Sequence, residues 1–296
     1  MIENFDEICK AKFEYMQEVY NHFLNENIKK HYDEFCLIEA FNDFSYELGR
    51  KADSYIPSPD KPYFQFALLR IHEKAVKVYR EATILLQYGS ASGAMARWRL
   101  LFELSVVANV LVKKPELSYK YINHCFVDDY RFGKKLVENK DKLQLEQYNL
   151  DAWSTIKSTY EKICKDFAWK GDNYEWAKCD EIKSPNLFEL SKFIGQDHFY
   201  AYVDESHLYN HPSARYLMGD MGAKAPNVED QIFLFSPFEL HLPMQLIVSS
   251  LHQVNCALIL GYGELENADH EELLEYLKTN SLFPETLINK VKEIDL

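Results

Sequence analysis

Residues 91–113, ASGAMARWRLLFELSVVANVLVK, constrain the fold of this chain more than any other stretch. From Leu100 to Val112 the run is apolar around nearly the whole circumference of a helix, and only three polar residues interrupt it. A helix that is apolar on all sides is buried on all sides. We therefore expect 91–113 to be a central helix of the hydrophobic core.

Two charged residues on this helix need partners. Arg99 and Glu103 are four positions apart, so their side chains lie on one helix face. An unpaired charge in a core costs on the order of several kcal/mol. In one interpretation Arg99 binds an anion and Glu103 orients it or acts as a base. In the other, the two residues form a structural pair that fixes the helix against a neighbour. The sequence leaves both open.

A second stretch, 238–262, is also mainly apolar. Between Leu240 and Gly263 there is no Asp, Glu, Lys or Arg, and this length could span a bilayer. The same stretch carries histidine, glutamine, serine and asparagine residues, which disfavour a lipid environment. We interpret it as a buried core helix paired with 91–113, and expect no membrane partner.

Apolar residues recur at helical spacing through most of the remaining chain, and strand signals are almost absent apart from IFLF at 232–235. The fold class is therefore all-α, a bundle of about eight to ten helices around the buried pair 91–113 and 238–262. Residues 66–88 read as a surface helix with one buried face, since charged residues fill the other side.

The segment SYIPSPDKPY, 54–63, contains three prolines and is the clearest linker. It predicts an N-terminal helical hairpin over 1–53 and a main helical domain over 64–263. The final residues, 264–296, are expected to form short helices at about 268–278 and 284–294, separated near Pro284 and packed on the body.

Composition narrows the classes of partner. The net charge is −13, and an acidic surface repels phosphate backbones, which disfavours broad nucleic-acid binding. The six cysteines form no C-x-x-C pair, and the chain shows no basic and apolar leader, so we expect reduced thiols in the cytoplasm. Walker-type, G-x-G-x-x-G and G-x-S-x-G motifs are absent. We expect no cofactor and no metal.

The run H-L-Y-N-H places His207 and His211 at the spacing of a helical metal site. Leu208 stands where a zincin motif has glutamate, and Pro212 pushes His211 out of helical geometry. The two imidazoles are therefore not expected to converge on a metal. A histidine at a helix break is well placed for proton transfer in a cleft, with the hydroxyls of Ser206 and Ser213 nearby in sequence.

Polar residues also follow one side of the apolar 238–262 helix. They recur at steps of three and four positions from His241 to Cys256, and include His252. Such a stripe lines a polar pocket, packs against facing polar groups, or contacts a protein. We favour a pocket or polar packing over catalysis, with His252 as a binding residue.

Two blocks of this sequence resemble a bacterial helical family, the domain of unknown function 5677. The first is R-W-R-L-L-F-E-L, which contains Arg99 and Glu103. The second lies downstream, in the same order as in the family, and consists of Tyr200, Tyr202, Ser206, His211, Pro212 and Ser213. The resemblance extends over about 66–260. It implies an all-helical fold in which Arg99, Glu103 and His211 gather in one site.

The family carries no established activity, although helical proteins of this kind are often suspected in phage defence or toxin systems. Our first hypothesis is a hydrolase acting on a phosphodiester or nucleotide. Arg99 would hold the charge on phosphate, His211 would move a proton and Glu103 would orient either group. Tyr202, Ser206, His207 and Ser213 would line the site.

The alternative is a helical module without enzymatic activity, which binds a protein partner, a small ligand or a second copy of itself. The acidic surface, the polar stripe and the aromatic loop around Trp169, Tyr174 and Trp176 motivate this hypothesis. The sequence does not decide between the two.

Overall fold

A computed structural model describes residues 5–55, 58–144, 150–210 and 240–294. Within these ranges the chain is helical and without a strand, which confirms the all-α prediction. The short IFLF segment lies outside the described residues. The helices, with η for short 3-10 turns, are α1 (Phe5–Lys30), α2 (Tyr32–Asp53), α3 (Pro62–Gln87), α4 (Ala91–Lys113), η1 (Pro115–Leu117), α5 (Ser118–Asn123), α6 (Cys125–Glu138), α7 (Leu150–Phe167), η2 (Glu175–Ala177), α8 (Leu187–Phe193), η3 (Asp197–Phe199), α9 (Tyr200–Asn210), α12 (His241–Gly263) and α13 (His270–Ile294).

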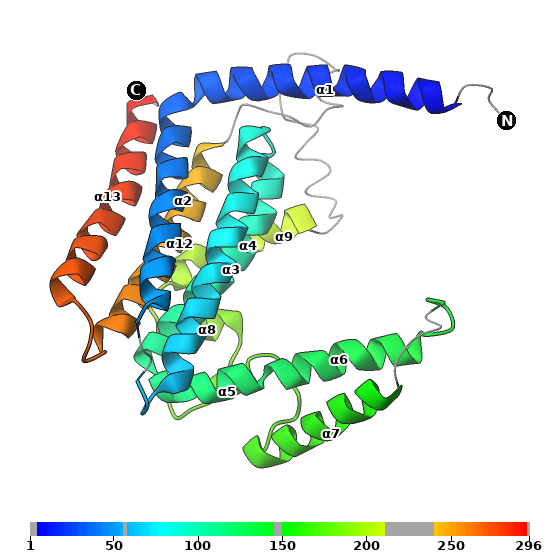
Figure 1. Ribbon diagram of the computed structural model, residues 1–296, viewed down its shortest axis with the longest axis vertical. Helices are drawn as coiled ribbons and strands as arrows, with labels where there is room; N and C mark the ends of the chain where they lie inside the picture. Colours follow the sequence, from blue (N-terminus) through cyan, green and yellow to red (C-terminus); the bar gives the residue numbers. More distant parts are fainter. Residues whose placement is uncertain (1–4, 56–57, 145–149, 211–239, 295–296) are drawn as a thin grey trace.

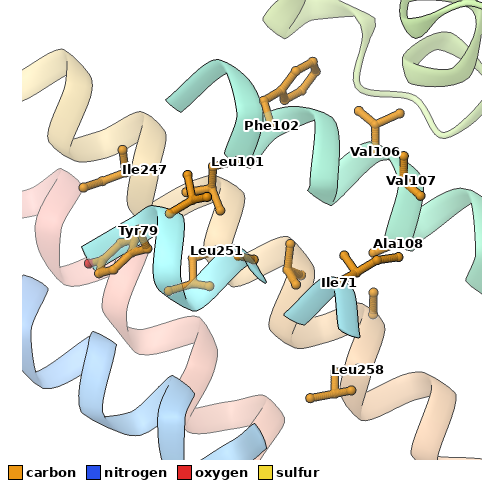
Figure 2. Packing of buried hydrophobic residues seen from close by; sticks show 14 of the residues in the cluster. Ile71, Tyr79, Leu101, Phe102, Val106, Val107, Ala108, Ile247, Leu251 and Leu258 are labelled. Atoms are coloured by element: carbon orange, nitrogen blue, oxygen red, sulfur yellow. The ribbon is translucent and has the colours of Figure 1, made fainter. Parts of the chain in front are cut away.

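The centre of the molecule is formed by α3, α4 and α12, which pack on one another. Ile71 of α3, Leu101 of α4 and Leu251 of α12 are almost completely buried and belong to one hydrophobic cluster (Figure 2). Burial of each such side chain contributes roughly 1.5–3 kcal/mol to folding. The expected central pair, α4 and α12, is confirmed, and α3 joins it.

Residues 66–88 form a helix with one buried and one exposed face, as predicted, and the buried face packs on both α4 and α12. Charged residues such as Arg70 and Lys77 are exposed, as expected, but the buried face of α3 is much wider than its apolar stripe. It includes the polar side chains of Gln65, His72 and Thr83. The sequence pattern did not predict these buried positions, because polar residues on a helix are normally expected to face solvent.

α12 has the length and hydropathy to cross a membrane, and 67% of its most apolar window is buried within the protein. It contacts α2, α3, α4 and α13. Gly261 allows the closest approach, since a Cβ at this position would collide with the Leu68 side chain and lie 3.4 Å from Phe64. The prediction of a core helix is confirmed.

The two short C-terminal helices expected near Pro284 are one helix, α13, with the proline inside it. Proline lacks the N–H that would bind the carbonyl four residues earlier, which is that of Asn280. His252 of α12 places its Nδ1 3.2 Å from this carbonyl oxygen. The prediction was wrong because the helix continues through the proline, and the carbonyl that loses its helical donor lies against α12.

The expected divisions at 53 and 264 stay predictions, but the packing describes how these parts meet the body. Buried side chains of α2, such as Phe41, and Leu287 of α13 belong to the same hydrophobic cluster as the three central helices. α1 lies across one end of the bundle, and α6 and α7 project at the opposite end (Figure 1). Phe5 and Phe13 in the first half of α1 are exposed, whereas Ile28 near its end packs against the core.

Candidate functional site

The two charged residues of α4 lie where expected but do not pair with each other. Arg99 and Glu103 are both half-buried, beside the fully buried Trp98 and Phe102. No ion pair joins them in the described part of the chain, because each has a different partner. The two side chains therefore do not form the structural pair with each other that was one of the two interpretations.

Arg99 contacts His207 of α9 through Nη1 and Nε2. A guanidinium donates hydrogen bonds and cannot accept them, so Nε2 of His207 must be the acceptor. This fixes a neutral imidazole that carries its proton on Nδ1. The contact holds the planar guanidinium against α9 and leaves its other N–H groups as donors for an anion.

Glu103 accepts a hydrogen bond from the hydroxyl of Tyr174. Burial, followed by the negative charge of Glu103 and the hydrogen bond itself, raises the pKa of Tyr174 far above its usual value. The phenol therefore stays protonated and acts as a donor at any physiological pH. Burial and the same carboxylate raise the pKa of the nearby Tyr121 to about 12.

Tyr174 reaches Glu103 from a tightly held loop between α7 and η2. Its backbone is left-handed, with φ of 63°, a strained conformation for a residue with a large side chain. Glu175 stabilises the loop by accepting hydrogen bonds of 2.7–2.9 Å from the backbone N–H groups of residues 170–172. Arg131 of α6 bonds the carbonyl of Gly171 and the side chain of Asn173. Glu175 and Arg131 thus hold the loop that carries Tyr174.

The aromatic residues of this loop, which motivated the hypothesis of a binding module, pack against other parts of the protein. Trp176 is almost completely buried and packs edge-on against Tyr121 with a centroid distance of 4.9 Å. Trp169 stacks on Phe167 at 4.6 Å and is half-buried. Trp176 thus belongs to the core and Tyr174 bonds Glu103, while the binding of a partner at this loop stays a prediction.

Two of the other expected binding residues lie on α9 near Arg99. Tyr202 is half-buried and its ring lies edge-on to Trp98, at 6.5 Å between centroids. Ser206 is fully buried and its hydroxyl donates to the carbonyl of Val203 at 2.7 Å, within its own helix. Tyr202 therefore packs beside α4 next to Arg99, and Ser206 is buried between α9 and its neighbours. His211 and Ser213 lie outside the described residues.

His252 does not belong to this group and sits in a buried polar network between α12 and α13. Its Nδ1 lies 3.2 Å from the Asn280 carbonyl oxygen and 2.9 Å from the Asn280 amide nitrogen, so it donates to one or accepts from the other according to its tautomer. Its Nε2 lies 3.6 Å from Sγ of Cys256. Burial lowers the pKa of His252. Polar packing, one of the two favoured readings of the stripe, describes this residue.

Asn255, which the stripe missed, connects this network to α2 and α3. Its amide donates to Ser45 and to the side chain of Asn280, both at 2.9 Å, and its oxygen lies 3.0 Å from Nε2 of His72. Burial lowers the pKa of His72 to about 4, and the hydrogen bond with Asn255 opposes part of this shift. The imidazole is thus neutral, and the network is structural.

Among the described residues, the functional candidates are four side chains on three segments: Arg99 and Glu103 of α4, Tyr174 of the loop and His207 of α9. Sequence reasoning placed His207 in the lining and missed Tyr174 as a partner of Glu103. The only signal was the aromatic loop itself, because the hydrogen bond spans 71 positions. The cluster offers a cationic donor, a carboxylate, a phenol and a neutral imidazole, which suits binding of an anion and proton transfer beside it.

A family model covers residues 65–227, and its description is "Family of unknown function (DUF5677)". The match includes α3, α4 and α9 and ends earlier than the expected limit near residue 260, so α12 and α13 lie outside it. No curated protein and no solved structure matches the chain. The matched segment holds more than half of the residues and all four side chains of the candidate site. The chain belongs to the family of unknown function DUF5677.

Proposed function

We propose that the protein binds a phosphate ester at Arg99 and hydrolyses it. The observation that supports this proposal is the contact between a half-buried guanidinium and the accepting nitrogen of His207, one helical turn from Glu103. Arginine is the side chain best suited to phosphate, because its planar donors match two phosphate oxygens. A phosphodiester or a nucleotide is the substrate class with this group.

His207 is the proton acceptor in this proposal. When phosphate oxygens take up the N–H groups of Arg99, Nε2 becomes available to a water molecule. The water oxygen attacks phosphorus as its proton passes to Nε2, the bond from phosphorus to the ester oxygen breaks, and the imidazolium returns the proton to the departing oxygen. Arg99 stabilises the charge that develops on the phosphoryl oxygens.

Glu103 and Tyr174 have a positioning role. The hydrogen bond from the phenol holds the carboxylate away from Arg99, which keeps the guanidinium open to an anion. Sequence reasoning gave the proton transfer to His211, whose role stays a prediction. A variant of His211 belongs in the same experiment for this reason.

The test is hydrolysis of RNA, DNA and nucleotides by the full chain and by Arg99→Ala, His207→Gln and His211→Gln. Arg97→Ala is the matched control, because Arg97 lies on the same helix and forms an ion pair with Glu81 instead. Loss of one transition-state donor or of the acid and base lowers the rate by about 100-fold or more. If folded Arg99→Ala and His207→Gln keep the parent's rate on a substrate that the parent cleaves, the assigned roles are wrong.

A parent that cleaves none of these substrates leads to the non-enzymatic alternative. Binding of inorganic phosphate and pyrophosphate by calorimetry then shows whether the site holds an anion at all. Binding that Arg99→Ala removes and Arg97→Ala preserves would assign an anion-binding module. The absence of binding by the parent would reject both the hydrolase and the anion-binding module.

A further inference from the structure

A second cluster of ligand-bearing side chains lies at the joint between α1 and α2, facing the first residue of α12. It consists of His31, Glu34 and His241, and one ligand atom from each lies within 4.8 Å of the other two. We propose that these three residues bind one divalent transition-metal ion of the zinc type. This site is independent of the Arg99 cluster and lies outside the family-matched segment.

The composition of the cluster suits this ion. Two imidazole nitrogens and one carboxylate are a common zinc ligand set, with bond lengths of about 2.0–2.2 Å and a fourth position for water. At these lengths the ligand atoms of a tetrahedral site are about 3.4 Å apart. The ligand atoms lie within 4.8 Å of one another, so small side-chain movements would bring them to this distance.

Glu34 supplies the negatively charged ligand of the cluster. The residue is only 4% exposed, and among the described residues no lysine or arginine forms an ion pair with it. A carboxylate removed from water without a compensating charge is strongly destabilising. A divalent ion would supply such a charge at the position where both imidazoles converge.

His241 provides an independent observation. Its Nε2 is buried and has no hydrogen-bond partner within the described part of the chain. The ring lies edge-on to that of His31, with centroids 5.4 Å apart and an angle of 81° between the planes. A buried nitrogen without a partner is destabilising, and coordination of a metal would satisfy it.

The ion would connect parts of the chain that are distant in sequence. His31 and Glu34 stand at the start of α2, and His241 is the first residue of α12. None of the three resembles a metal motif by spacing, and for this reason the sequence predicted no metal. Bound zinc would fix the beginning of the central helix α12 to the end of α1, so its effect is on stability.

The experiment uses the full chain after treatment with a chelator. Zinc is titrated by calorimetry, and cobalt is added separately as a spectroscopic probe. We expect one zinc per chain, a melting temperature that rises with zinc concentration, and cobalt bands of tetrahedral nitrogen and oxygen coordination without a thiolate band.

The variants are Glu34→Gln and His241→Ala, with His270→Ala as a control because His270 is exposed and distant from the cluster in sequence. Each ligand variant should lower zinc affinity at least tenfold and abolish the rise in melting temperature, whereas the control should behave like the parent. Glu34→Gln keeps the size of the side chain and serves if His241→Ala does not fold. Equal affinity in the parent and both ligand variants, or a folded parent that binds no zinc, would overturn the proposal.

Discussion

Nη1 of Arg99 contacts Nε2 of His207 across 108 positions of sequence, and this contact joins α4 to α9. It should be measurable as an energetic coupling. In a double-mutant cycle of Arg99→Ala and His207→Ala, we expect a coupling of about 0.5–1 kcal/mol, because both side chains are half-buried and partly screened by water. Urea unfolding of the four proteins gives this value. The pair Arg97→Ala and His207→Ala is the control and should be additive.

Tyr174→Phe removes the donor to Glu103 and leaves the aromatic ring in place. A hydrogen bond to a charged group contributes about 1.5–3 kcal/mol when shielded, and we expect the lower end here because Glu103 is half-exposed. The free energy of unfolding from urea titration measures the loss. In a Glu103→Gln background the same change should cost less, and an undiminished cost would show that the hydroxyl acts elsewhere.

His72 predicts a dependence of stability on pH. Its pKa is about 4 in the folded protein, against 6.5 in the unfolded chain, so the unfolded chain binds more protons between these values. Stability is therefore complete above pH 6.5 and is lost as the pH falls toward 4. Between pH 7 and pH 5 this amounts to about 2 kcal/mol.

The measurement is the unfolding free energy of the parent and of His72→Gln at several pH values. Glutamine does not titrate, so the variant should lose less stability on acidification, whatever its stability at pH 7. Parallel curves for the two proteins would mean that His72 is not the neutral buried group described here. His252 shifts in the same direction and stays present in both proteins.

Gly261 and Gly263 form a matched pair on α12. A Cβ at Gly261 would collide with Leu68, whereas a Cβ at Gly263 would meet only Leu273, at an ordinary 3.9 Å. Gly261→Ala should lower the unfolding free energy by about 1–3 kcal/mol through overpacking. Gly263→Ala should be neutral or stabilising, because alanine favours helix over glycine. Thermal unfolding of both variants tests the close approach of α3 and α12.

The helices and the central pair could be predicted because their signal is local. The apolar circumference of Leu100 to Val112 requires burial on every side, whatever the neighbours are. The width of the buried face of α3 could not be predicted, since buried His72 is paired with Asn255 of α12, which is distant in sequence. The helix that runs through Pro284 likewise lies against His252 of α12, which is distant in sequence.

The candidate site shows the same limit. Arg99 and Glu103 stood out as charges on an apolar helix, and this needed no partner. Their actual partners come from an irregular loop and from α9, and periodicity carries no information about contacts of this length. The pairing of Glu103 with Tyr174 also requires a left-handed residue, which no pattern in the loop predicts.

The position of α12 has a consequence for the limits of the folding unit. The segment covered by the family model ends at residue 227 and holds α3 and α4 but not the helix that packs against both. A fragment that ends at residue 227 would expose the apolar surfaces of α3 and α4 that α12 covers. It should aggregate or form a molten state, with helical circular dichroism but no cooperative melting. Adding residues 240–294, in the same chain or as a separate peptide, should restore a sharp transition.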